Sequence, residues 1–168
     1  NDPNHLLLLA KTTRGYQNLM KIVTASHLEG FYYKPRLDWE LLEKFGRDVI
    51  VTSACLQGAV SQALLHNQPK TAKAYVEKML KLFGDDFYLE IQSHPQISAQ
   101  LIATQKIIKL SREMGVPLVA TNDVHYVDPQ DAQAQDALLA IQTKKLLSDT
   151  DRLSMINSPD FYLRSGEE

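Results

Sequence analysis

Short apolar runs alternate along the chain with longer segments in which apolar residues recur every three or four positions. The runs at 5–10, 48–53, 86–92 and 118–120 predict β-strands, and the first and last are expected to be buried. The longer segments predict helices at 13–27, 39–45, 59–66, 69–83, 98–114 and 128–141. Strands that alternate with helices favour an α/β fold with mostly parallel strands. About four strands are too few for a closed barrel of about eight, so we expect an open sheet or a barrel that lacks its first strands.

Local signals indicate where several of these helices begin and end. Asp38 is a good N-cap, and Gly46 follows the helix that it starts. Ser98 is expected to cap the helix at 98–114, and Asp128 with Pro129 is a strong start for the last helix. From Thr143 the chain is polar, and within this tail the run 161–163 predicts a short strand or an extended contact.

Composition indicates one globular domain over residues 1–168, since 44% of its 168 residues are hydrophobic and 23% are charged. Eighteen Lys and Arg against 20 Asp and Glu give a net charge of −2, which provides no basic surface for nucleic acid. A single cysteine, Cys55, excludes an internal disulfide and fits a reducing cytoplasm. No apolar run approaches the roughly 20 residues of a membrane helix, so no membrane partner is expected. Because the chain opens without Met, we expect it to be a piece of a longer protein.

Candidate chemistry follows the last predicted strand, in the sequence Thr-Asn-Asp-Val-His-Tyr at 121–126. Ligands and catalytic groups of parallel sheets lie where strands end. Asp123 and His125 are two residues apart, so in an extended chain both side chains leave the same face. A carboxylate and an imidazole are ligands for Zn²⁺ or Mn²⁺, and Asn122 would support them. The alternative is that Asp123 caps a turn and His125 hydrogen-bonds locally.

Further candidates lie at or near other strand ends. Cys55 follows the strand at 48–53, and His5 stands at the start of its strand, where it fits the same edge less simply. The alternatives are that Cys55 is a small buried hydrophobe and that His5 is structural. Glu90 would hold a metal ligand in place or face solvent, and Lys34 and Arg36 would hold a phosphate or lie on a solvated loop. The remaining histidines are interpreted as surface or packing residues: His27, His66 and His94.

Five blocks together resemble the PHP (polymerase and histidinol phosphatase) domain of bacterial DNA polymerase III alpha subunits, of the Gram-positive type. They occur in the order and at the intervals of that family, from one end of the chain to the other: 5–11, 30–36, 53–56, 87–92 and 120–126. The resemblance implies part of a distorted (β/α)₇-type barrel whose strand ends gather metal ligands. Members with the full ligand set act as a phosphoesterase or 3′-5′ exonuclease, and others serve as scaffold.

The resemblance implies metal ligands at four positions. Asp123 and His125 match the last metal motif of the family, and His5 and Cys55 match single ligand positions. The His-x-His pair and the following Asp and His of the first strands have no counterpart here, so we expect an amino-terminally truncated domain with an incomplete Zn²⁺ or Mn²⁺ site. No residue of the piece is assigned a catalytic role.

The function implied is a segment of a replicative DNA-directed DNA polymerase, a cytoplasmic nucleotidyltransferase. Its own Mg²⁺-binding carboxylates would lie beyond Glu168, and the tail at about 143–168 would lead towards the next domain. Expected partners are the rest of the alpha chain, DNA through the whole enzyme, and replisome subunits. We expect no polymerase activity and little nuclease activity from residues 1–168 alone. The alternative is a silent scaffold that braces the polymerase core or its exonuclease subunit. A third hypothesis is a free-standing small-molecule phosphatase, which the aromatic loop at 30–36 disfavours.

Overall fold

The computed structural model describes residues 3–157 and 160–167. Its four strands form one sheet in chain order: β1 (Leu7–Ala10), β2 (Val49–Thr52), β3 (Phe87–Gln92) and β4 (Leu118–Thr121). β2, β3 and β4 are parallel, whereas β1 runs antiparallel to β2. The prediction of an α/β fold with a mostly parallel open sheet is confirmed.

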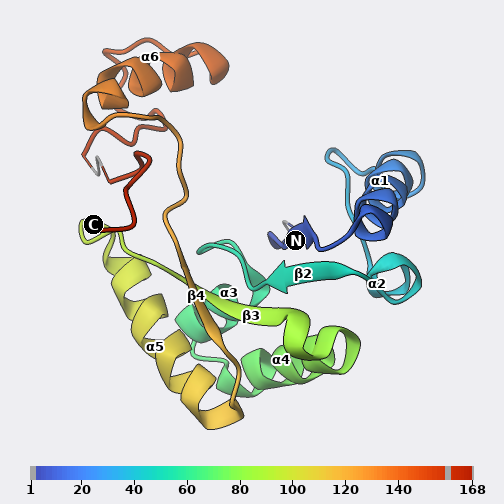
Figure 1. Ribbon diagram of the computed structural model, residues 1–168. Helices are drawn as coiled ribbons and strands as arrows, with labels where there is room; N and C mark the ends of the chain where they lie inside the picture. Colours follow the sequence, from blue (N-terminus) through green and yellow to red (C-terminus); the bar gives the residue numbers. More distant parts are fainter. Residues whose placement is uncertain (1–2, 158–159, 168) are drawn as a thin grey trace.

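The described residues also form six α-helices and two 3₁₀ turns. The α-helices are α1 (Thr13–Leu28), α2 (Trp39–Phe45), α3 (Ala59–Leu65), α4 (Pro69–Phe83), α5 (Ser98–Met114) and α6 (Ala132–Gln142), and the turns are η1 (Gly84–Asp86) and η2 (Pro129–Asp131). Figure 1 shows α3, α4 and α5 gathered along the sheet, with α1 and α2 beyond β2. α6 stands apart from them, at the end of the segment that follows β4 (Figure 1).

Most of the predicted helix boundaries are confirmed. The Asp38 carboxylate accepts a hydrogen bond of 2.9 Å from the Leu41 amide, and Gly46 follows α2. Asp128 and Asp131 form a reciprocal capping box at η2, which leads into α6. The predicted cap at Ser98 is wrong: Ser98 is the first helical residue, and Ile97 occupies the cap position without a side-chain hydrogen bond.

The hydrophobic core lies between the sheet and the helices α3, α4 and α5. Val49, Val51, Phe87 and Leu89 are buried in it, because alternate residues of β2 and β3 point to the same face. The even-numbered residues of both strands, such as Thr52, therefore point to the opposite face of the sheet. That face is polar at the carboxyl ends of the strands, and the site described below lies there.

The predicted burial of the first and last strands is wrong. Leu7 is 38% exposed, Leu9 49% and Leu118 37%. The reason is that β1 and β4 are the two edge strands of the described sheet, so each has a neighbouring strand on one side only. An apolar run indicates a strand, but the sequence alone does not say whether the strand is central.

The segment after α6 returns to the loop that follows β4. Tyr162 forms a parallel β-bridge with Tyr126, which confirms the predicted extended contact at 161–163. Residues 158–159 and 168 of the predicted tail lie outside the described residues. No helix in the described part of the chain is long and apolar enough to span a bilayer.

Candidate metal centre

The end of β2 brings Cys55 and His5 together, as predicted. The Cys55 Sγ atom lies 3.5 Å from His5 Nδ1, and the His5 amide donates a hydrogen bond of 2.9 Å to the Gln57 carbonyl oxygen. The expected difficulty with His5 disappears because β1 is antiparallel to β2, so the start of β1 meets the end of β2. Cys55 is half-buried and His5 is exposed.

A tight turn presents the Cys55 thiol. Ala54 has a φ of 58°, in the left-handed region that a non-glycine residue adopts only when its surroundings enforce it. The Gly58 amide closes the turn with a hydrogen bond of 2.9 Å to the Cys55 carbonyl oxygen. A Cβ atom at Gly58 would lie 2.0 Å from the Ser53 carbonyl oxygen, so only glycine fits here.

The end of β4 carries Asp123 and His125, but not in the extended form that their spacing favoured. Asp123 has a φ of 50°, so the chain turns there, and the extended chain that would direct both side chains to one face is not found. His125 Nδ1 donates a hydrogen bond of 2.6 Å to the Asp123 carbonyl oxygen. Because a carbonyl oxygen only accepts, the neutral imidazole keeps its lone pair on Nε2. Both residues are exposed, and Nε2 is the nitrogen suited to bind a metal.

The returning segment 160–164 holds this loop in place. The Phe161 carbonyl oxygen accepts a hydrogen bond of 2.8 Å from the His125 amide, and the Asn122 side chain donates to the carbonyl oxygens of Asp160 and Tyr162. Asn122 therefore supports the loop through its backbone contacts. The Phe161 ring also lies edge-on to the His125 imidazole, with centroids 5.3 Å apart.

His94 is a residue whose importance the sequence did not indicate. It follows β3 and is 1% exposed, and its ring stacks on Phe161 with centroids 4.0 Å apart. Neither of its ring nitrogens has a hydrogen-bond partner among the described residues. Burial lowers the pKa of His94, although the charges of Asp123 and Asp160 oppose this shift, so the imidazole is neutral near pH 7. The pattern gave no signal beyond the position of His94 just past a strand.

The environment of Cys55 favours the thiol over the thiolate. Burial raises the pKa of Cys55; a backbone hydrogen bond from Gln57 opposes this shift, and the negative charge of Asp123 adds to it. Asp123 is thus near enough to Cys55 for its charge to act on the sulfur. A bound cation would reverse this balance, because metal ligation deprotonates a thiol.

Glu90 is buried, so the expectation that it faces solvent is wrong. Its side chain is 5% exposed on the polar face of β3. It accepts hydrogen bonds from the Thr52 hydroxyl on β2, from the Thr121 hydroxyl on β4 at 2.5 Å and from the Gln92 amide at 3.0 Å. Glu90 therefore joins three strands through neutral donors.

Lys34 and Arg36 line a cavity of about 850 Å³ that also has His5 and Trp39 in its wall. The Arg36 guanidinium lies over the Tyr32 ring at 5.1 Å, and its Nε atom is buried without a partner among the described residues. The two cations therefore adjoin the His5 end of the site, and they face a space large enough for a small ligand.

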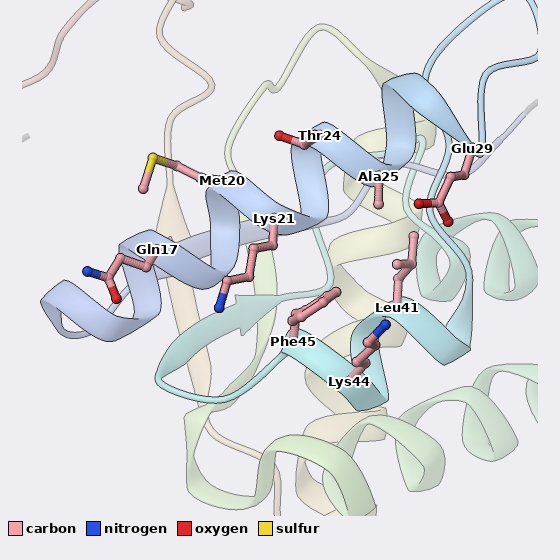
Figure 2. Close-up of a pocket in the computed structure, with 9 residues that line it drawn as sticks. All are labelled: Gln17, Met20, Lys21, Thr24, Ala25, Glu29, Leu41, Lys44 and Phe45. Carbon is pink, nitrogen blue, oxygen red and sulfur yellow. The ribbon is translucent and has the colours of Figure 1, made fainter.

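A second cavity, of about 470 Å³, lies between α1 and α2 (Figure 2). It is lined by Gln17, Met20, Lys21, Thr24, Ala25, Glu29, Leu41, Lys44 and Phe45. None of the predicted site residues is among them, so this cavity is separate from the strand ends.

The donor types at the strand ends suit a divalent cation. Imidazole nitrogen, thiolate sulfur and carboxylate oxygen bind Zn²⁺ and related metals. The two buried ring nitrogens of His94 make no hydrogen bond to the described residues, so they are available to a ligand. Within residues 3–157 and 160–167, however, no three His, Cys, Asp or Glu side chains stand in an arrangement that would hold one ion. The structure thus gives two partial sets, His5 with Cys55 and Asp123 with His125.

Comparison with known proteins identifies relatives over nearly the whole chain. The chain is 48% identical over 164 residues to the DNA polymerase III subunit alpha of Borreliella burgdorferi, covering 98% of this chain and 14% of that protein. It is 44% identical over 144 residues to the same subunit of Aquifex aeolicus, covering 86% of this chain and 12% of that one. It is also 41% identical over 164 residues to the DNA polymerase III subunit alpha of Thermus aquaticus, covering 98% of this chain and 13% of that protein.

The chain thus spans about one seventh of the length of these curated relatives or less. Their names do not bear on the Gram-positive type, which stays a prediction. The family described as "PHP domain" matches residues 1–94, more than half of the chain, and this range includes His5, Cys55, Glu90 and His94. The chain belongs to the PHP domain family.

Proposed function

We propose that the strand-end site binds a divalent metal ion, Zn²⁺ or Mn²⁺, and serves phosphoester hydrolysis on DNA within a DNA polymerase III alpha subunit. The contact that carries this proposal is the 3.5 Å approach of Cys55 Sγ to His5 Nδ1, two metal-binding atoms from residues 50 positions apart. Asp123 and His125 supply the second half of the ligand set from the loop after β4. Membership of the PHP family supports a general dependence on a divalent metal.

Each side chain has a defined task in this proposal. His125 offers Nε2, since its Nδ1–H is held by the Asp123 carbonyl oxygen. The His5 imidazole, with Nδ1 3.5 Å from Cys55 Sγ, would be the neighbouring ligand, and the thiol would release its proton to solvent when the metal binds. When bound, the metal would polarise a phosphoryl oxygen and lower the pKa of a water. Lys34 and Arg36, on the cavity wall beside His5, would hold the phosphate of the substrate.

The wider role proposed is that of the relatives whose names are given above. The polymerase activity, its Mg²⁺, and its contacts with DNA and with other replication proteins would depend on parts of a longer alpha subunit. The cytoplasmic location stays a prediction. A scaffold role, in which these residues make ordinary hydrogen bonds, is the competing function.

Metal content tests the proposal. We expect about one equivalent of Zn²⁺ or Mn²⁺ in the purified protein by elemental analysis, and Asp123→Ala and His125→Ala should each lose it. His66→Ala is the matched control, because His66 is an exposed imidazole on another surface, with Nδ1 bonded to the Gln62 carbonyl oxygen. A protein without metal, or with metal that survives both site variants, would establish the scaffold role instead.

Binding of a single-stranded oligonucleotide tests the phosphate contact in the same preparations. Lys34→Ala and Arg36→Ala should weaken binding, measured by fluorescence anisotropy, whereas Lys70→Ala on α4 should not. Equal weakening by all three variants would mean that the cavity beside His5 has no particular role and that only net charge matters.

A further inference from the structure

The buried carboxylate of Glu90 has a specific set of partners. No ion pair with Lys, Arg or His involves Glu90 in the part of the chain that the structure describes. Burying a charged carboxylate is strongly unfavourable unless hydrogen bonds satisfy it. Both of its oxygens are satisfied here, one by Thr52 and the other by Thr121 and Gln92. The protein thus commits three donors from three strands to one acid.

On the β2 side, these hydrogen bonds continue to the residue before Cys55. The Thr52 hydroxyl donates to Glu90 and accepts a hydrogen bond of 3.2 Å from the Ala54 amide. The Ser53 hydroxyl accepts a hydrogen bond of 2.9 Å from the Glu90 amide. The three residues that precede Cys55 are therefore all connected to Glu90 by hydrogen bonds: Thr52 and Ser53 directly, and Ala54 through Thr52. This includes Ala54, whose left-handed backbone needs such support.

On the β4 side, the contact lies two residues before Asp123. The Thr121 hydroxyl donates to Glu90 at 2.5 Å and accepts from Gln92 at 3.3 Å. Asp123 then takes up its own left-handed turn. One carboxylate on β3 thus fixes the last residue of β2 and the last residue of β4. These two strands lie on either side of β3 (Figure 1).

We propose that Glu90 is a positioning residue that couples the ends of β2 and β4, so that Cys55 and Asp123 come within reach of one shared cation. This inference rests on the proposed metal site. Two strand spacings separate these ends by about 10 Å. Ligand atoms on one ion lie at most about 4.5 Å apart, because each metal–ligand bond is 2.0–2.3 Å. Both side chains must therefore lean inwards, and a small rotation of either strand end would separate them.

Cobalt binding tests this coupling, because Co²⁺ is a spectroscopic substitute for Zn²⁺ and a bound thiolate gives a charge-transfer band. In the purified protein we expect Glu90→Gln, which keeps the shape but removes the charge, to weaken Co²⁺ binding about 10-fold or more, the size typical of residues that orient ligands. Thr121→Val removes one donor and should weaken binding too, whereas Thr121→Ser keeps the hydroxyl and should restore it. Asn18→Ala is the control for a general loss of stability. Asn18 is buried and its side chain donates to the carbonyl oxygen of Arg47, which precedes the first residue of β2, far from the metal-binding end.

A second measurement separates this inference from the proposed function. Amide hydrogen exchange at Ala54 and His125, whose amides donate to the Thr52 hydroxyl and the Phe161 carbonyl oxygen, should accelerate together without metal in Glu90→Gln and remain unchanged in Asn18→Ala. A parent protein that binds no Co²⁺ would refute the metal site, and the exchange data would still show whether Glu90 couples the strand ends. Exchange that accelerates at neither residue, or at only one, would overturn the coupling. So would Co²⁺ affinity in Glu90→Gln and Thr121→Val equal to that of the parent.

Discussion

Replacing Phe161 with alanine is expected to release segment 160–164 from the loop after β4. Phe161 is 5% exposed, and its ring contacts two imidazoles, His94 face to face and His125 edge-on. Loss of a buried phenylalanine side chain costs about 3–5 kcal/mol, of which an aromatic pair accounts for about 0.5–1.5 kcal/mol. Each backbone hydrogen bond of the segment contributes about 1 kcal/mol. The Phe161 ring therefore contributes more than any single backbone hydrogen bond to holding segment 160–164 in place.

The loss corresponds to local opening that is roughly 10²- to 10⁴-fold more frequent, since about 1.4 kcal/mol is a factor of ten. Native-state amide exchange, followed by NMR, measures this opening at His125 and Leu163. Their amides donate to the Phe161 and Tyr126 carbonyl oxygens at 2.8 and 3.1 Å. The Leu89 amide, which donates to the Pro117 carbonyl oxygen in the core, should keep its protection and serves as the internal reference.

Two further variants make this prediction specific. Phe161→Leu keeps apolar bulk and should give an intermediate rate. Leu163→Ala changes a side chain that is 60% exposed and should alter exchange by no more than about twofold. If the His125 and Leu163 amides of Phe161→Ala exchange as slowly as those of the parent, the aromatic ring does not hold the segment and the reasoning is wrong.

Two other predictions concern the pH dependence of single groups. The negative charge of Asp123 helps to raise the pKa of Cys55, so Asp123→Asn should shift the pH profile of Cys55 alkylation by iodoacetamide to lower pH. Asp85→Asn, at the other end of the sheet, is the control. Coincident profiles for Asp123→Asn and the parent would contradict the interaction between Asp123 and Cys55. Hydrogen bonds from Arg152, at 2.6 and 2.7 Å, and from Ser154 lower the pKa of Asp136 to about 2. A depressed pKa stabilises the folded form above the unfolded value near 4 and loses this effect as pH falls towards 2. We therefore expect the contact of segment 152–154 with α6 to loosen as the pH falls from about 4 to about 2, as measured by carboxyl and amide NMR shifts. In Asp136→Asn the contact should already be loose at pH 7, whereas Asp151→Asn should leave it unchanged. Loss of the contact above pH 5 would show that Asp136 is not the group responsible.

Local features were predictable because local physics decides them. The cap at Asp38, the end of α2 at Gly46 and the apolar stripe of α4 all follow from residues a few positions apart. β2 followed from its β-branched run for the same reason. The strand-to-helix order that these signals produce was enough to predict the α/β class.

Features of the site were predictable only in part. Five sequence blocks indicated the family, the resemblance implied the four ligand candidates, and the pairing of His5 with Cys55 is found as expected. The chain is not extended at Asp123, and hydrogen bonds from the Asn122 side chain to a segment 38–40 residues away hold the loop after β4. Side chains such as His94 and Glu90 gave no reliable signal, since their burial depends on elements distant in sequence.

The sequence by itself determined which segments become strands and helices, and which residue types are present to bind a metal. The tertiary structure decided the direction of β1, which brings His5 to the end of β2. It also decided the burial of Glu90 between Thr52 and Thr121, and the place of Phe161 between two imidazoles. The physical reason is one of range. Backbone propensities and caps act over a few residues, whereas strand direction and side-chain burial follow from the packing of segments that are 30 to 70 residues apart.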